Sequence, residues 1–504
     1  MSFYKRKNNR YEVYKKLNKN LKVEWFSNAR ADILAGIVVC MALIPEAIGF
    51  SIVAGVDPMV GVYASFCMSL IISIFGGRTG MISAAAGAMA LVLASLVKDY
   101  GIEYMLAATI LTGIFQVILG FFKIGNLLKF IPKPVMIGFV NALGIMMFKS
   151  QLPHFNGGFI LLILGAIGVL IIYLFPKLTK SVPSPIISII VVTLIVFIFK
   201  IDVKTLGDMG KVTSELPKFL IPNIPLNMET IKIILPYSIS LSLVGIVESL
   251  LTAQLVDDLT DTPSDKNREC IGQGLANMVS GFFGGIAGCG MIGQTIINQT
   301  YGGRGRLSTL ISGTAMLISV IVLNKFVTQI PVVALGAVMI VVSISTFNWE
   351  SIKRIRKVPK SDTFVMISTV VTVLLTHNLA YGVIVGIILS SIFFAAKISE
   401  ISVEKIKEDK KVIYLAHGQL FFASTLKFIN SFDFTEDVDT VDINLSKVRI
   451  WDESAVDSID KVVIKFHKNG IKTNLIGMST QCLELIDRMS IHNKPGKLDV
   501  ASGN

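Results

Sequence analysis

Long apolar stretches alternate with short polar ones over most of this chain, from about residue 30 to about residue 397. Most of these stretches span fifteen to just over twenty residues, which suits bilayer-crossing helices or half-helices. We predict fourteen segments, at about 29–49, 57–75, 81–97, 102–122, 132–150, 157–175, 184–200, 233–256, 270–284, 289–300, 307–323, 331–347, 362–378 and 380–397. This pattern is typical of an all-α polytopic membrane protein.

The pattern changes after Lys397, where charges mix with short alternating stretches. Alternation and β-branched residues predict strands at 412–419, 439–448 and 472–478, and helices are expected at 423–432 and 453–470. Alternating strands and helices indicate a small α/β domain. We therefore predict a basic N-terminal segment (1–28), a membrane domain (29–397) and an α/β domain with its linker and tail (398–504).

Composition supports a polytopic membrane protein and argues against a soluble enzyme. The chain of 504 residues is 52% hydrophobic and 16% charged, with a mean hydropathy of +0.67. The net charge of +12 concentrates in short basic stretches, with eight Lys or Arg in the first 22 residues and five in 351–362. Such stretches orient membrane proteins, so we expect a multi-pass plasma (inner) membrane protein with a cytoplasmic N-terminus and C-terminal domain, and no nucleic-acid partner.

Two runs of small residues interrupt apolar segments. The run "GGIAGCGMIGQT" (284–295) has five glycines, and each costs roughly 1 kcal/mol in a helix interior. The run "GGRTGMISAAAGA" (76–88) is its counterpart in the first half. Irregular backbone at membrane depth persists only where it is buried in protein or lines a cavity. Each run also follows, by about forty residues, a carboxylate inside an apolar span, Glu46 and Glu248 respectively.

This shared order indicates an internal repeat. Seven segments lie in each half, about 29–200 and 233–397, and an odd number gives the halves opposite topology. Each run would then begin a half-helix whose free N–H groups attract anions without Lys or Arg. The candidate anion-binding residues are Ser83, Ala84, Ala85, Gly290, Met291 and Ile292. Close helix packing is the alternative explanation for either run alone.

The two carboxylates suggest coupling to a cation, because a charge within the membrane is costly and usually functional. Glu248 is followed one turn later by Thr252, and together they present oxygens that suit Na⁺. A proton on Glu248 is the other possibility. The structural alternatives are a water-facing position for Glu46 and a pairing of Glu248 with Gln254 or Asn277.

Four stretches together resemble the SulP family of anion transporters with a C-terminal STAS domain, over almost the whole chain. "ALIPEAIGFSIVAGVDPMVGVYASF" (42–66) is similar to the first-helix signature, and "FGGRTGMISAAAGAMALVLA" (75–94) to the third helix. Residues 248–310 resemble the block of helices eight to ten, and "RIWDESAVDSIDKVVIKF" (449–466) resembles the STAS core. The resemblance implies a seven-plus-seven inverted repeat with core and gate domains, elevator-like motion and a homodimer.

The resemblance also assigns roles to residues. In the family the anion lies between the N-termini of the third and tenth helices, which are the two small-residue runs here. A sodium-coupled bicarbonate member holds Na⁺ with an acidic residue and a hydroxyl one turn later, which match Glu248 and Thr252, with Glu for the shorter Asp. The family's Pro-Thr-Gly is replaced by the Ala-Ala-Gly of residues 85–87.

Anti-sigma antagonists with this domain carry a phosphorylated serine, and it maps to Ser454 in "WDESA". Helix capping by Asp452 or Ser454 is the simpler expectation. The resemblance likewise suggests a cytoplasmic partner protein that binds the STAS domain.

The function expected first is cation-driven uptake of a small inorganic anion, with sulfate ahead of bicarbonate. A dicarboxylate symporter and a passive anion channel are alternatives. No nucleophile–base set or metal-ligand cluster is apparent in the sequence, so neither an enzyme nor a cofactor, apart from a bound Na⁺, is expected. The five cysteines lack metal-site spacing and are predicted to be free thiols.

Overall fold

The computed structural model describes residues 22–126, 131–156, 158–179, 183–210, 212–225, 227–435 and 437–491. Most of the predicted basic N-terminal segment, residues 1–21, lies outside the described residues. The chain forms two compact units, Met1–Ile387 and Ile388–Asn504.

Each of the fourteen predicted membrane segments contains a helix. The helices are α2 (Ala29–Ala54), α3 (Pro58–Phe75), α4 (Gly87–Tyr100), α5 (Ile102–Phe121), α6 (Lys133–Gln151), α7 (Phe159–Leu174), α8 (Ser184–Ile198), α10 (Met228–Thr260), α11 (Lys266–Phe282), α12 (Ile292–Thr300), α13 (Arg306–Val322), α15 (Val332–Thr346), α17 (Lys360–Thr376) and α18 (Leu379–Ile398). Eight helices in the described part of the chain are long and apolar enough to cross a membrane. Short helices α9 (Leu206–Met209), α14 (Asn324–Val327) and α16 (Trp349–Arg354) connect them.

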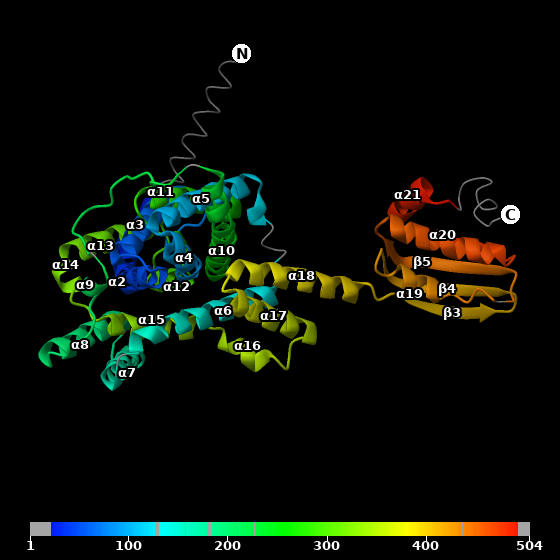
Figure 1. Cartoon of the computed structure of the whole chain (residues 1–504). Coiled ribbons are helices and arrows are strands. Elements are labelled where there is room, and N and C mark those ends of the chain that lie inside the picture. Colours follow the sequence, from blue (N-terminus) through cyan, green and yellow to red (C-terminus); the bar gives the residue numbers. More distant parts are fainter. Residues whose placement is uncertain are drawn as a thin grey trace, which may run out of the picture. The chain divides into compact units, whose positions relative to one another are not determined.

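The membrane helices form two groups (Figure 1). In the first, α2 to α5 pack with α10 to α13, and in the second, α6 to α8 pack with α15 and α17. Helices α5 and α11 approach closely through glycines: a Cβ on Gly113 would lie 2.4 Å from the carbonyl oxygen of Gly274. Small residues therefore do serve close packing here, as they do in many membrane bundles.

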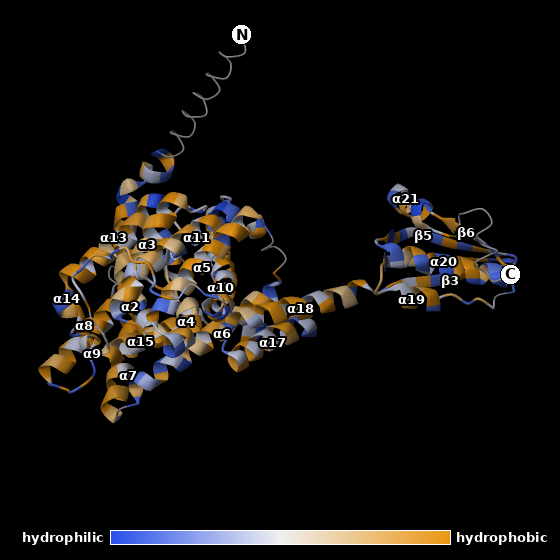
Figure 2. Cartoon of the chain, turned by 45° about the horizontal axis from the view of Figure 1, so that its top comes forward, coloured by the Kyte–Doolittle hydropathy of each residue, from blue (hydrophilic) through white to orange (hydrophobic). Residues whose placement is uncertain are grey.

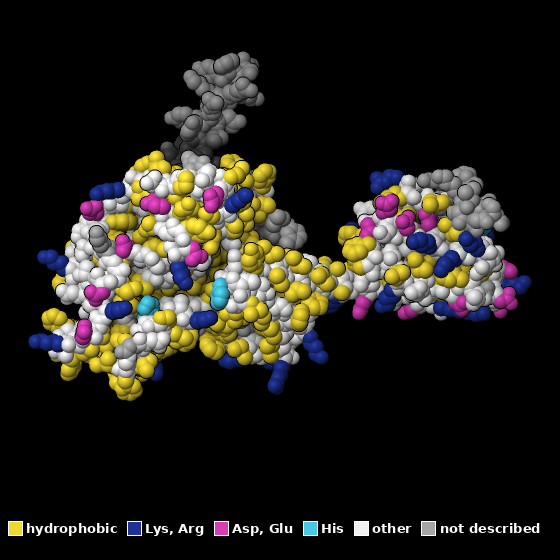
Figure 3. Space-filling view, viewed as in Figure 1, with side chains coloured by type: hydrophobic (Ala, Val, Ile, Leu, Met, Phe, Trp, Pro, Cys, Tyr) yellow, Lys and Arg dark blue, Asp and Glu magenta, His cyan; other side chains and the backbone are white. Residues whose placement is uncertain are grey.

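The membrane helices are largely hydrophobic, as the hydropathy colouring in Figure 2 shows. Phe159 on α7, Phe197 on α8 and Leu375 on α17 are each more than 70% exposed. Figure 3 shows the same broad hydrophobic surface over this unit. Such a surface is stable in lipid and not in water, which confirms the membrane class.

Both small-residue runs break their helices. Strand β1 (Ser83–Ala85) precedes α4, and strand β2 (Gly288–Gly290) precedes α12. The two strands pair with each other in antiparallel register, with Ser83 opposite Gly290 and Ala85 opposite Gly288. Helices α4 and α12 therefore begin near one another from strands of opposite direction, as expected for repeats of opposite topology.

The C-terminal unit is a four-stranded α/β domain. Its strands are β3 (Ser402–Glu408), β4 (Lys411–Leu420), β5 (Thr440–Ile450) and β6 (Lys472–Ile476), in the order β3-β4-β5-β6. The first pair is antiparallel and the other two are parallel. Helices α19 (Thr425–Asn430), α20 (Glu453–Lys468) and α21 (Thr480–Met489) complete it. The three predicted strands and two predicted helices are confirmed, whereas β3 and α21 were not expected.

Asp452 caps helix α20 by accepting a hydrogen bond from the backbone N–H of Ala455 at 2.9 Å. The same carboxylate accepts a second hydrogen bond, from the backbone N–H of Phe422, at 2.9 Å. Ser454 lies exposed in the first turn of the helix and is not the capping residue. Of the two capping candidates, Asp452 is therefore the correct one.

Candidate functional site: two paired strands at the starts of half-helices

Side chains of neighbouring helices hold the backbone of β1. The backbone N–H of Ala85 donates to the hydroxyl of Ser65 at 3.1 Å, and the hydroxyl of Ser69 donates to the carbonyl of Ser83 at 3.1 Å. The hydroxyl of Ser83 itself accepts from the amide of Gln273 on α11 at 2.7 Å. Strand β1 pairs only with β2, so these hydroxyls and amides satisfy backbone groups that the two-stranded ladder leaves unpaired at membrane depth.

The backbone of β2 is held in the same way, from α10 and α11. Asn277 both donates to the carbonyl of Gly288 (3.1 Å) and accepts from its N–H (2.8 Å). The N–H of Gly290 donates to the hydroxyl of Ser249 at 2.8 Å, and its carbonyl accepts from the hydroxyl of Thr252 at 3.1 Å. Gly288 has no room for a side chain, because a Cβ there would lie 2.3 Å from a backbone oxygen of β1.

The predicted anion-binding residues come together, but several of their N–H groups are already engaged. The N–H groups of Ala85 and Gly290 bond to serines, and that of Met291 bonds to the carbonyl of Ile82 at 2.8 Å. Ser83 and Ala84 are fully buried within β1.

Free N–H groups therefore lie slightly further along each run. The first turn of a helix has N–H groups without intrahelical partners, which here means residues 87–89 of α4 and 292–294 of α12. Ile292 is the first residue of α12, and Gly293 beside it is exposed, with no atom within 4 Å of a Cβ placed there. Of the predicted residues, only Ile292 belongs to these first turns, and the other unpaired N–H groups lie a few residues further along the chain than predicted.

Glu46 lies inside α2 and is only 9% exposed, so the water-facing alternative is wrong. Its carboxylate accepts a hydrogen bond from the amide of Gln294, in the first turn of α12. The carboxylate of the first half thus touches the small-residue run of the second half. No sequence signal connects these two residues, which are 248 positions apart.

Glu248 lies against the same run from α10. Its carboxylate accepts a hydrogen bond from the thiol of Cys289 at 3.0 Å. The hydroxyl of Thr252 lies 2.8 Å from the backbone oxygen of Glu248 and 3.1 Å from that of Gly290. Helix α10 thus brings a carboxylate and a hydroxyl against β2, and carboxylate, hydroxyl and carbonyl oxygens are the ligands that hard cations prefer.

The alternative partners of Glu248 are engaged elsewhere. Gln254 donates to Asp258 at 2.8 Å, and Asn277 bonds to Gly288 and to Gln116. Structural pairing of Glu248 with either residue is therefore wrong.

A charged cluster that the sequence did not predict joins the start of the first run to the connection between α10 and α11. Arg78, just before β1, forms an ion pair of 3.1 Å with Asp257 near the end of α10, and Lys266 lies 2.7 Å from the same carboxylate. Glu269 accepts hydrogen bonds from the backbone N–H groups of Gly77 and Arg78 at 2.8 and 3.0 Å. Burial lowers the pKa of Arg78, and the charge of Asp257 opposes this shift. The sequence indicated this cluster only through the charged residues in 76–82 and 257–269.

Comparison with known proteins fits this architecture. The profile of the "Sulfate permease family" matches residues 30–161 and 157–369, and that of the "STAS domain" matches residues 400–501. The chain belongs to the sulfate permease family. This is a family of transporters and not of enzymes, and the resemblance noted from the sequence is confirmed.

Two relatives and one solved structure illustrate the range of the family. "Putative sulfate transporter YbaR" of Bacillus subtilis (strain 168) is 54% identical over 93% of this chain and 99% of its own length. "Bicarbonate transporter BicA" of Picosynechococcus sp. is 27% identical over 76% of this chain and 73% of its own. Murine Slc26a9, an anion transporter solved in an inward-facing state, shares the fold with a TM-score of 0.81 at 18% identity, over 94% of this chain and 89% of that one.

Proposed function

We propose that this protein is a secondary active transporter that carries a small inorganic anion, sulfate first, together with H⁺ or Na⁺. The observation that carries the proposal is the contact of both membrane carboxylates with the second small-residue run, Glu46 through Gln294 of α12 and Glu248 through Cys289 of β2. The proposed anion donors and cation ligands would thereby lie along one stretch of chain, β2 and the start of α12. The 54% identity to a protein named as a sulfate transporter supports sulfate as the substrate.

The anion would bind between the first turns of α4 and α12. Backbone N–H donors and the positive helix ends favour an anion there without a charged side chain. Phe50 and Met147 approach Gly87 closely: a Cβ on Gly87 would lie 2.9 and 3.0 Å from their side chains. Met147 belongs to α6, in the other helix group, so both groups meet at this position.

The cation would bind at Glu248, Thr252 and the carbonyl of Gly290. Na⁺ would use these oxygens directly, whereas H⁺ would reside on the Glu248 carboxylate. Either cation would neutralise a charge beside the anion site, which gives a physical reason for coupled binding. Glu46 would contribute in the same way through Gln294.

Transport would proceed by elevator-type alternating access. The group of α2 to α5 and α10 to α13 would carry the anion as the core, and the group of α6 to α8 with α15, α17 and α18 would remain as the gate. The contact between Gly49 of α2 and Met339 of α15 belongs to this sliding surface, since a Cβ on Gly49 would lie 2.8 Å from the Met339 sulfur.

Bicarbonate transport with Na⁺ is the second candidate. It is favoured by the 27% identity to a bicarbonate transporter and by the oxygen ligands around Thr252. A dicarboxylate symporter or a passive channel is the remaining alternative.

Uptake into proteoliposomes tests the proposal. Labelled sulfate and bicarbonate would be offered under imposed Na⁺ or H⁺ gradients, to wild type, Glu248→Gln and Asp258→Asn. Asp258 is the matched control, because it lies on the same helix but is exposed. We expect gradient-driven uptake of sulfate that loses its gradient dependence only in Glu248→Gln. Uptake that ignores both gradients in wild type would refute symport and indicate passive conduction.

The proposal includes the assembly and location expected from the sequence. The protein would be a homodimer in the plasma (inner) membrane, with the N-terminus and the STAS domain in the cytoplasm. Ser454 would be a regulatory phosphorylation site: it is exposed at the N-terminal end of α20, where a phosphate is favoured by the helix dipole. A cytoplasmic partner would then bind this end of the STAS domain in a phosphorylation-dependent way.

A further inference from the structure

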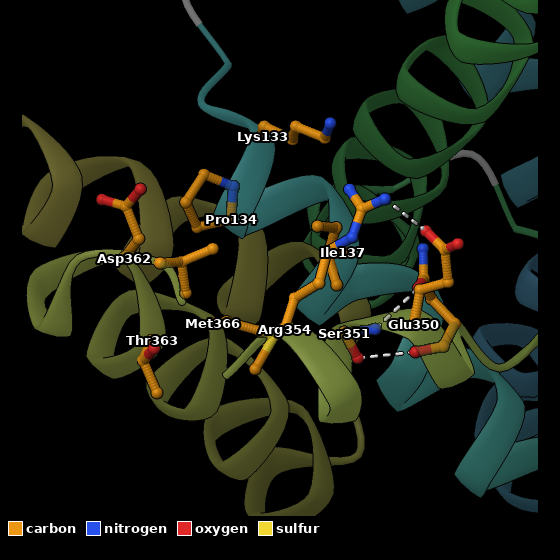
Figure 4. A pocket seen from close by; sticks show the side chains of 11 residues that line it. Lys133, Pro134, Ile137, Glu350, Ser351, Arg354, Asp362, Thr363 and Met366 are labelled. Atoms are coloured by element: carbon orange, nitrogen blue, oxygen red, sulfur yellow. Dashed lines mark hydrogen bonds and ion pairs between the residues drawn. The ribbon is translucent and has the colours of Figure 1, made fainter. Parts of the chain in front are cut away.

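A charged cavity of about 220 Å³ lies between α6, α16 and α17, away from the anion site. Figure 4 shows Arg354 and Glu350 paired at one side, Asp362 at the other and Lys133 at the start of α6. Two cations and two anions thus line the same cavity, together with apolar residues of α6 and α17. A ligand with one positive and one negative group would match this lining.

The charges of the cavity are available to a ligand. Arg354 and Glu350 are 3.1 Å apart, but their side chains are 60% and 71% exposed, and such surface pairs contribute little stability. Within the part of the chain that the structure describes, no ion pair engages Lys133 or Asp362. A ligand could therefore pair with these groups at little cost.

The surroundings place the cavity at a membrane interface. Trp349 and Ile352 on α16 are 54% and 52% exposed, and Phe364 on α17 is 53% exposed. Exposed tryptophans and basic side chains are typical of the boundary between lipid headgroups and hydrocarbon, and residues 351–362 supply five Lys or Arg.

A second, apolar cavity of about 500 Å³ lies further along α6. Ile137 lines the first cavity, Gly144 and Phe148 line the second, and Asn141 lies on the same helical face between them. Seven residues of helix separate Ile137 from Gly144, about 10 Å at 1.5 Å per residue. A charged cavity at the interface and an apolar one about two turns deeper match a headgroup and an acyl chain.

We propose that these two cavities bind one phospholipid with a zwitterionic, primary-amine headgroup, of the phosphatidylethanolamine type. Its phosphate is held by Lys133 and Arg354, its ammonium by Asp362, and one acyl chain lies against Ile145 and its neighbours. The lipid thus contacts α6, α16 and α17. This site is independent of the proposed transport function.

Native mass spectrometry of the delipidated, full-length protein tests the proposal. The protein is titrated with equal amounts of dioleoyl phosphatidylethanolamine, phosphatidylcholine and phosphatidylglycerol. Wild type is expected to retain phosphatidylethanolamine over phosphatidylcholine, because a quaternary ammonium cannot donate to the Asp362 carboxylate. Equal retention of all three lipids, or preference for the anionic one, overturns the proposal.

Matched variants separate the two cavities. Asp362→Asn is expected to reduce the preference for the primary amine by ~tenfold, as the loss of one charge-assisted contact would. Lys357→Met, on the same loop but outside the cavity, is the control and should match wild type.

Ile145→Trp fills the apolar cavity and should reduce retention of all three lipids alike, whereas Ile163→Trp, on the lipid-facing side of α7, should not. If Ile145→Trp does not fold, Phe148→Ala, at an exposed position of the same cavity, should show the same loss. The proposal is overturned if lipid retention by Asp362→Asn equals that of Lys357→Met and retention by Ile145→Trp equals that of Ile163→Trp.

Discussion

Substitution by alanine at Gly288 and at Gly293, both in the second run, should affect stability differently. A methyl group added at Gly288 would lie 2.3 Å from the carbonyl oxygen of Ala84, whereas one added at Gly293 meets no atom within 4 Å. Neither glycine has a positive φ that would disfavour alanine. The contrast therefore isolates the space between the paired strands.

The magnitudes follow from the two environments. Gly288→Ala must separate β1 from β2, and forcing a methyl group into a packed site typically costs about 1–3 kcal/mol. It also strains the bonds of Asn277 to Gly288, so the upper part of this range is expected. Gly293→Ala lies in the first turn of α12 and should be neutral or stabilising by up to about 1 kcal/mol, because alanine favours helix.

Thermal unfolding of both purified variants in one detergent provides the assay, with sulfate uptake measured in parallel. We expect a lower melting temperature only for Gly288→Ala. Gly293→Ala should fold as wild type does, yet alter the apparent KM for sulfate if anions approach this turn. Equal melting temperatures for the two variants would refute the paired-strand geometry.

Two further predictions address other parts of the chain. Asn277→Ala should destabilise the membrane unit by about 2–6 kcal/mol, because two buried backbone groups of Gly288 each lose a partner at about 1–3 kcal/mol; thermal unfolding against Asn469→Ala, an exposed control, measures this. In the STAS domain, burial raises the pKa of Asp442 but bonds from Lys411 and Asn474 lower it overall. Asp442 therefore stabilises the fold above its unfolded pKa. Hydrogen exchange of β5 should show protection lost in Asp442→Asn at pH 7, and no difference well below about pH 4.

Much of this architecture could be predicted because it depends on local composition. Apolar length predicts membrane helices, and glycine runs predict helix breaks, so all fourteen segments and both interruptions are seen in the structure. The strands of the STAS domain alternate clearly. Strand β3, "SVEKIKE", does not, because it is an edge strand whose residues are nearly all exposed and charged on both faces.

Partner choice could not be predicted, because it depends on distant segments coming together. The sequence shows that Glu46 and Glu248 are embedded in apolar spans, but not that both contact the second run. The sequence likewise cannot show that the hydroxyls of Ser65 and Ser249 accept hydrogen bonds from the N–H groups of Ala85 and Gly290. Serines in membrane helices are common, and only the fold shows which backbone groups they satisfy.

Because side chains from neighbouring helices hold the backbone of β1 and β2, substitutions in the strands and in those helices should differ in their effects. The unpaired N–H groups lie in the first turns of α4 and α12, so they do not depend on the residue type at positions 83–85. The hydroxyls and amides behind the strands do matter, because each satisfies a buried backbone group whose loss costs about 1–3 kcal/mol. Variation of Ser249, Thr252 or Asn277 would instead change the geometry of β2 itself.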